Sequence, residues 1–278
     1  MKPFEEYLSY DGKDSVVTWK EYRAGAAENR KKTIRYETGF PEFDTFVDGV
    51  ASGELIVVSG NTGQGKTLFV KSLVRGFASQ DVPTTVFSYE VPTDQFLESY
   101  EDLPRCETLY VPKELKTNDV AWIKEKVIEA RAKYDNKIVV IDHLHYIVEM
   151  SSQKNFSLTV GEALRKLKQE IAIGLNQVVV LICHQQSLGG EVEPSISTIR
   201  DSSFTGQEAD MVLIVHRIPD RTHLIVADGA HDRKEKIPPQ DWTYDNGQAF
   251  VKIDKARRTG VYKKKCTFQK RGAWLEPL

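Results

Sequence analysis

Residues 55–67 read LIVVSGNTGQGKT, and this stretch decides the fold. It begins with a short apolar run that is typical of a strand buried on both faces. The remainder fits the pattern G-x-x-x-x-G-K-S/T, in which glycines let the backbone wrap around a polyphosphate and N–H groups at a helix start meet its charge. The stretch therefore predicts a nucleotide-binding loop made of Gly60, Asn61, Thr62, Gly63, Gln64, Gly65, Lys66 and Thr67.

Two side chains of this loop have defined tasks in the pattern. Lys66 reaches the β- and γ-phosphates, and the Thr67 hydroxyl binds Mg²⁺. ATP and Mg²⁺ are therefore the expected cofactors. The alternative is a chance glycine-rich turn, against which the strand before the loop and the helix after it both argue.

Short apolar runs alternate with helical stretches beyond the loop. The runs at residues 55–59, 84–87, 137–141, 177–182 and 211–215 predict strands, and residues 66–80, 119–134 and 159–175 predict helices. Because the runs are continuous rather than alternating, they indicate parallel strands covered on both faces. We expect an α/β fold with a mostly parallel central sheet flanked by helices.

Two carboxylates follow these predicted strands. Asp142 ends the run KIVVID and is the expected second Mg²⁺ ligand, unless it only caps the next turn. Glu90 follows the strand at residues 84–88, which we expect to lie next to the strand of the phosphate loop. A carboxylate there is placed to act as the general base that orients the attacking water; an exposed turn glutamate is the alternative.

Composition excludes several classes of protein. The chain has 278 residues, a formal net charge of −2 and 40% hydrophobic residues, which is enough for a sizeable core and too much for a disordered tail. It contains no apolar run of about 18 residues and its first residues lack a signal-peptide core, so no membrane association is expected. Three dispersed cysteines fit a reducing cytoplasm.

Local amino-acid composition also divides the chain into segments. We expect an N-terminal arm over residues 1–36, with a helical segment at 18–30 that contains too few apolar residues to form a core alone. Residues 37–278 form the predicted α/β domain, with a charged surface excursion at 218–248 and strand-like runs around a basic turn after residue 249.

Six segments in order resemble the ATPase domain of DnaB-type replicative helicases, which have the RecA-like fold of P-loop NTPases. The first segment, TGFPEFDTFVDGVASGELIVVSGNTGQGKT, resembles the start of that domain. Five further segments follow in order: FSYEVPTDQF, VVIDHLHYI, VVVLICHQQ, IRDSSFTGQEADMVLIVHR and VKIDKARRTGVYKKKCTFQKRGAWLEP. The resemblance covers residues 37–278 apart from the excursion. A histidine after the fourth segment's strand favours the phage-like branch, and we expect neither a collar nor a primase domain.

The resemblance assigns further roles. His184 would be the sensor that links the γ-phosphate to the DNA loop, although a satisfied core histidine is the plain alternative. Lys255 and Arg257 would project into a neighbouring subunit's ATP site, with Arg258 ranked lower and a solvated basic turn as the alternative. The ssDNA-binding loop would include Arg200, Asp201 and Ser203.

These features together predict an ATP-dependent DNA helicase that moves on single-stranded DNA as a ring, most simply a homohexamer with ATP between subunits. Primase or a loader is a candidate partner, and action in the cytoplasm of a bacterial host is expected. Two alternatives remain open at this point: a RecA-like recombinase filament protein, and a regulatory RecA-like ATPase that binds no DNA.

Overall fold

The computed structural model describes residues 5, 8–12, 15–29, 33–101, 107–116, 120–148, 156–185, 195–199, 202–218 and 247–278. The chain divides into two compact units, Met1–Lys32 and Thr33–Leu278. None of the helices in the described ranges is long and apolar enough to cross a membrane.

The first unit contains the helix α2 (Trp19–Asn29), as its composition predicts. Thr18 and Glu21 stabilise its start by a reciprocal pair of bonds: the Thr18 N–H donates to the Glu21 carboxylate at 2.8 Å, and the Glu21 N–H donates to the Thr18 hydroxyl at 3.3 Å. Large apolar side chains of this unit, including Val16, Trp19 and Tyr22, are exposed.

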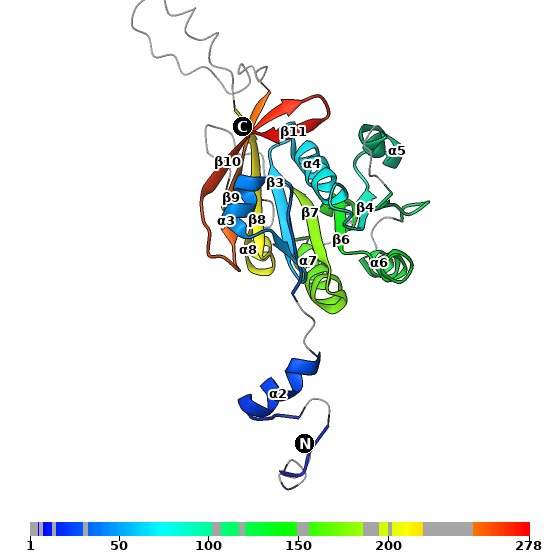
Figure 1. Cartoon of the computed structure of the whole chain (residues 1–278), viewed down its shortest axis with the longest axis vertical. Helices are drawn as coiled ribbons and strands as arrows, with labels where there is room; N and C mark the ends of the chain where they lie inside the picture. Colours follow the sequence, from blue (N-terminus) through cyan, green and yellow to red (C-terminus); the bar gives the residue numbers. More distant parts are fainter. Residues whose placement is uncertain are drawn as a thin grey trace, which may run out of the picture. The chain divides into compact units, whose positions relative to one another are not determined.

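The second unit is built on a nine-stranded sheet with the order β11-β10-β9-β8-β3-β7-β6-β4-β5 among the described residues (Figure 1). The strands β8, β3, β7, β6, β4 and β5 are parallel, and β9, β10 and β11 continue the sheet in antiparallel fashion. Their bounds are β3 Leu55–Gly60, β4 Thr84–Ser88, β5 Leu109–Tyr110, β6 Ile138–Asp142, β7 Val178–His184, β8 Met211–Arg217, β9 Gln248–Ala256, β10 Lys264–Arg271 and β11 Trp274–Pro277.

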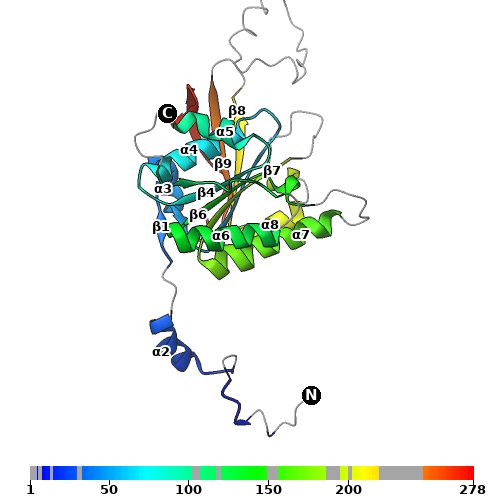
Figure 2. The same ribbon diagram turned by 90° about the vertical axis from the view of Figure 1, so that its right-hand side faces the viewer.

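Helices cover both faces of this sheet (Figure 2). One face packs on α3 (Pro41–Val47), α4 (Lys66–Ala78) and α5 (Thr93–Leu97), and the other on α6 (Val120–Tyr134), α7 (Phe156–Lys166) and α8 (Ser202–Glu208). Successive residues of β3 alternate between the two cores, Ile56 and Val58 facing one and Leu55 and Val57 the other. Burial of both faces explains why the strands read as continuous apolar runs.

Smaller elements complete the unit. A two-stranded sheet pairs β1 (Arg35–Tyr36) with β2 (Val50–Ala51). Single helical turns follow α5, β6 and the segment after β7: η1 (Glu98–Tyr100), η2 (Leu144–Tyr146) and η4 (Ile196–Thr198).

The predicted strands and helices are all present, but two details differ. The helix expected at residues 159–175 begins earlier, at Phe156, and its second half is a π-helix, η3 (Leu167–Ile173). The strand that precedes Glu90 does not lie next to the phosphate-loop strand, so that prediction was wrong: β7 and β6 separate β4 from β3. The runs of β6 and β7 are apolar up to their last residue and lie between β3 and β4, whereas β4, which begins with two threonines, lies next to the edge strand β5.

The C-terminal part forms the predicted strands around a basic turn. Most of the predicted excursion at 218–248 lies outside the described residues, so its role stays a prediction.

Candidate nucleotide-binding and hydrolysis site

The phosphate loop joins the end of β3 to the start of α4, as the sequence pattern predicts. A side chain at Gly60 would not fit, because a Cβ there would lie 2.3 Å from the Val215 carbonyl oxygen. Gly65 has a φ of +92°, a conformation that glycine adopts without strain. The glycines at these two positions therefore allow the tight turn that the loop makes before α4.

Lys66 is the first residue of α4 and is only 6% exposed. Its ammonium donates to the Asn61 carbonyl at 3.0 Å. Burial lowers the pKa of Lys66, and the neighbouring carboxylates Glu90 and Asp142 partly offset this effect. A buried cation beside a loop of this shape is placed to meet a phosphate anion.

Thr67 and Asp142 come together beside Lys66. The Thr67 hydroxyl donates to Asp142 Oδ2 at 3.2 Å, and Asp142 is fully buried. Its other oxygen, Oδ1, has no hydrogen-bond partner among the described residues. Burial, with help from the charge of Glu90, raises the pKa of Asp142 to about 7. A hydroxyl and a buried carboxylate with a spare oxygen are hard ligands that fit Mg²⁺.

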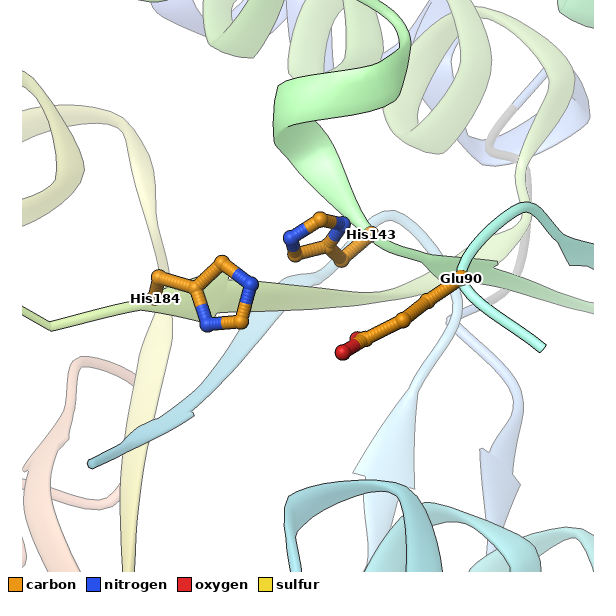
Figure 3. A group of neighbouring side chains, drawn as sticks. All are labelled: Glu90, His143 and His184. Atoms are coloured by element: carbon orange, nitrogen blue, oxygen red, sulfur yellow. The ribbon is translucent and has the colours of Figure 1, made fainter. Parts of the chain in front are cut away.

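Glu90 reaches the same site from the end of β4, the strand next to β6. Ser88 pairs with Asp142 in the register of β4 and β6, and the Tyr89 and Glu90 N–H groups donate to the Asp142 carbonyl at 2.6 and 3.1 Å. These bonds hold the segment after β4 against the end of β6. The Glu90 side chain is exposed, and its carboxylate points toward the rings of His143 and His184 (Figure 3).

His184 ends β7 and pairs with Gly60 in the register of β3 and β7. The proposed sensor therefore lies directly beside the first glycine of the phosphate loop. Parallel strands place their carboxyl ends at one edge of the sheet, which brings together residues that lie far apart in the sequence.

His143 is the residue that sequence reasoning missed. It follows Asp142 and is 4% exposed, and its ring packs edge-on against His184 with the centroids 4.0 Å apart. Burial, followed by the neighbouring His184, His145 and Lys66, lowers the pKa of His143 to about 3. The ring is therefore neutral at physiological pH. A histidine directly after a strand-ending aspartate, with a second histidine two residues on, was the available signal.

A cavity of about 180 Å³ adjoins the phosphate loop on the side of β8. Gly63, Gln64, Arg217 and Lys270 are among its lining residues, and the Arg217 N–H donates to the Gln64 side chain at 2.7 Å. A larger cavity of about 540 Å³ lies along β5 and α6 and is lined by none of the predicted site residues.

Lys255 and Arg257 lie where the parallel strands begin, at the edge of the sheet opposite to the phosphate loop. This follows because β9 runs antiparallel to β8 and Ala256 pairs with Met211, the first residue of β8. The Lys255 ammonium donates to the Gly206 and Ala209 carbonyls at 2.7 and 2.6 Å. The Arg257 guanidinium donates to the Gln207 carbonyl at 2.6 Å. The structure thus does not bring these two residues to the phosphate loop of their own chain.

Arg258 has a different environment from Arg257. Its guanidinium donates to the Glu54 carboxylate at 2.9 Å, to the Asp48 carboxylate and to three backbone carbonyls of residues 47–49. The Arg258 side chain is 24% exposed, whereas that of Arg257 is 50% exposed. Arg258 therefore holds the start of the domain in place.

Of the predicted DNA-binding residues, Arg200 and Asp201 lie outside the described residues. Ser203 is exposed and belongs to the first turn of α8 rather than to a loop. The segment before it is held to β9, because the Ile196 N–H donates to the Asp254 carboxylate at 2.6 Å.

The sheet order, the phosphate loop and the carboxylates at the strand ends define a P-loop nucleotide-binding domain of the RecA-like class. The sequence matches the family described as DnaB-like helicase C-terminal domain over residues 36–101 and 100–275. The chain belongs to this family.

Curated relatives and solved structures agree with this assignment. The chain is 24% identical over 255 residues to the replicative DNA helicase DnaB of Helicobacter pylori (strain 26695), covering 80% of this chain and 51% of that protein. It is 25% identical over 252 residues to the DnaB of Mycoplasma pneumoniae, covering 77% and 52%. The chain thus spans about half the length of these curated relatives.

Two solved structures show the same fold. A DnaB-like replicative helicase, described together with its interactions with primase, matches with a TM-score of 0.68 and 17% identity over 100% of this chain and 72% of that one. A solved ATPase domain matches with a TM-score of 0.69 and 17% identity over 97% of this chain and 100% of that one.

Proposed function

We propose that this protein is an ATP-dependent DNA helicase that translocates on single-stranded DNA and unwinds duplex DNA during replication. The observation that carries the proposal is the convergence of Lys66, Asp142, Glu90 and His184 at one edge of the sheet, in a chain of the DnaB-like family. The names of the relatives support replication as the setting.

ATP hydrolysis would use the residues of this edge in separate tasks. The phosphate loop and Lys66 would bind the triphosphate, and Thr67 and Asp142 would hold Mg²⁺, which would neutralise charge on the phosphates. Glu90 would accept a proton from the attacking water. The oxygen of that water bonds to the γ-phosphorus while the bond from the γ-phosphorus to the departing ADP breaks. His184, beside Gly60, would respond to the presence of the γ-phosphate.

The distance between the two edges supports an oligomer. Lys255 and Arg257 lie at the edge opposite to the phosphate loop, so their proposed role requires a second copy of the chain. An arginine supplied by a neighbouring subunit can accelerate phosphoryl transfer by about 10³–10⁵. We infer a homo-oligomeric ring, most simply a hexamer, with each ATP between two subunits.

The exposed apolar side chains of the first unit support a role for residues 1–36 in assembly. Val16, Trp19 and Tyr22 are exposed in the single chain, and burying them against another subunit is favourable. Deleting residues 1–30 should therefore weaken the oligomer in light scattering. An unchanged oligomer would contradict this role.

Single-stranded DNA would follow the segment between β7 and α8, with Arg200, Asp201 and Ser203 near its backbone. The hydrogen bond from the Ile196 N–H to the Asp254 carboxylate holds this segment to β9 shortly before α8. Sequence-independent binding requires charge neutralisation along the strand, which a ring multiplies by repeating each residue. Primase or a loader, and action in the cytoplasm, remain predictions.

Strand separation on a forked DNA duplex tests the proposal. The protein with ATP and Mg²⁺ should release the labelled strand, and the Lys66→Ala variant, which lacks the phosphate contact, should not. Stimulated ATP hydrolysis without strand release would favour the recombinase reading. No response to DNA at all would favour a regulatory ATPase.

A further inference from the structure

Three side chains at the ends of neighbouring strands form a compact cluster of metal-binding atoms. Glu90 follows β4, His143 follows β6 and His184 ends β7, and one ligand atom from each lies within 4.8 Å of the others. Figure 3 shows the two rings and the carboxylate directed toward a common space.

His143 supplies the independent observation. It is 4% exposed, yet neither of its ring nitrogens has a hydrogen-bond partner among the described residues. A buried polar atom without a partner costs about 1–3 kcal/mol, so such a group is expected to acquire one in the working protein. A neutral imidazole has one nitrogen with a free lone pair, and this nitrogen can coordinate a metal ion.

The geometry points to a transition-metal site made of Glu90, His143 and His184 in the nucleotide-free protein. Two imidazole nitrogens and one carboxylate form a ligand set that suits Zn²⁺, Co²⁺ or Ni²⁺. The set differs from the oxygen-only pair Thr67 and Asp142, which suits Mg²⁺. The proposed site is therefore chemically distinct from the one that the nucleotide requires.

Closing the site requires only a small movement. Bonds of about 2.0–2.2 Å place tetrahedral ligands roughly 3.4 Å apart, closer than the 4.8 Å limit found here. The rings of His143 and His184 already pack against each other with centroids 4.0 Å apart. Glu90 is exposed, so its carboxylate can swing toward them, leaving room for water or another ligand in the fourth position.

Metal binding at this site would compete with ATP hydrolysis. A bound ion would hold Glu90 and His184, which the proposed function uses as general base and sensor. This consequence rests on the proposed function, whereas metal binding itself does not. The experiment therefore measures binding first, without nucleotide or DNA.

Co²⁺ is the probe for the binding test, because its visible absorption distinguishes four- or five-coordinate protein sites from the hydrated ion. The full chain, freed of metal and nucleotide, is titrated with Co²⁺ and then with Zn²⁺. We expect one tight Co²⁺ per chain with strong visible bands, and displacement by Zn²⁺. His143→Gln should weaken binding by at least about tenfold, because it removes a ligand.

His145→Gln is the matched control. This histidine lies near both rings, with centroids 5.2 Å from His143 and 5.5 Å from His184, but it is not one of the three ligands. It should leave Co²⁺ binding unchanged. Equal losses in both variants would overturn the proposed ligand set, as would wild-type protein that gives only the spectrum of hydrated Co²⁺.

Folding of each variant is checked by circular dichroism and by binding of a fluorescent ATP analogue. If His143→Gln does not fold, His184→Gln and Glu90→Gln replace it, and unchanged Co²⁺ affinity in both would overturn the proposal. Tight Zn²⁺ binding that leaves ATP hydrolysis intact would keep the metal site and contradict the roles of Glu90 and His184 in the proposed function.

Discussion

The two edges of the parallel strands differ in how their polar side chains are satisfied. At the carboxyl edge, Asp142 Oδ1 and the ring of His143 are buried without hydrogen-bond partners among the described residues. At the opposite edge, Asp210 accepts bonds from the Lys168 ammonium at 2.5 Å and the Leu55 N–H at 2.8 Å. Arg258, at the same edge, makes five bonds.

This difference separates function from stability. Buried groups without partners lower the stability of a fold, so they persist where a ligand completes them. The proposals above place phosphate, Mg²⁺ and a transition-metal ion at the carboxyl edge, whereas the opposite edge holds the strands and the start of the domain together. Arg257 is the exception at that edge: its side chain is 50% exposed although it pairs with Asp210 at 3.4 Å, and its proposed role lies in the ATP site of a neighbouring subunit.

The largest expected effect concerns this exception. Arg257→Ala should lower ATP hydrolysis by about 10³-fold or more, because it removes charge stabilisation in the transition state. Steady-state hydrolysis measures the loss. Mixing this variant with Lys66→Ala should restore part of the activity, since one variant supplies an intact phosphate loop and the other an intact Arg257. Failure of every mixture to regain activity would contradict a role between subunits.

Glu90→Gln should come next, with kcat lowered by about 10²–10⁴-fold, because the amide cannot accept the proton of the attacking water. Its shape is retained, so the affinity for a fluorescent ATP analogue should stay close to that of the wild type. Single-turnover hydrolysis and equilibrium binding separate the two. A rise in KM with unchanged kcat would show that Glu90 only binds the nucleotide.

Arg258→Ala sharpens the comparison from the side of stability. It leaves the Glu54 carboxylate and three backbone carbonyls without their donor, so the free energy of unfolding should fall by about 2–4 kcal/mol. Arg257→Ala is the matched control and should cost less than about 1 kcal/mol, because its side chain is half exposed. Denaturant titration of both variants decides; equal losses would remove the distinction.

Asp142→Asn has a smaller expected effect on stability than Arg258→Ala, and the size of that effect depends on pH. Burial raises the folded-state pKa of Asp142 to about 7, so protonation of Asp142 stabilises the folded, metal-free protein. This stabilisation is complete below the unfolded pKa of about 3.9 and is lost as pH rises to about 7.

The asparagine variant avoids the loss, so it should be more stable than the metal-free wild type by about 1–3 kcal/mol above pH 7 and not below pH 4. Denaturation at several pH values with a chelator present measures the difference. A constant difference across pH would show that Asp142 does not titrate in this range.

The sequence was sufficient for the elements and the phosphate loop, because strands buried on both faces have continuous apolar runs and the loop pattern specifies its own chemistry. It did not determine strand order, since the position of β4 depends on how the crossovers pack. Nor did it reveal the π-helix at Leu167–Ile173, because helical periodicity does not distinguish the hydrogen-bond pattern.

Individual residues show the same limit within the site. Lys66, Asp142 and Glu90 could be predicted, since each follows a strand or begins a helix in a defined pattern. The burial of His143 between Glu90 and His184 could not, because it follows from three strands meeting at one edge. The contrast between Arg257 and Arg258 likewise could not be predicted. It arises because the start of the domain, with Glu54 and Gly49, packs against Arg258.

The most direct test of the central claim is the rate of ATP hydrolysis with and without a long homopolymeric single-stranded DNA. A DNA-driven motor built on this edge of the sheet should hydrolyse ATP much faster when the DNA is present, and Glu90→Gln should abolish the stimulated rate. Unchanged hydrolysis in the presence of DNA, with the basal rate intact, would contradict the proposal that this protein is a helicase.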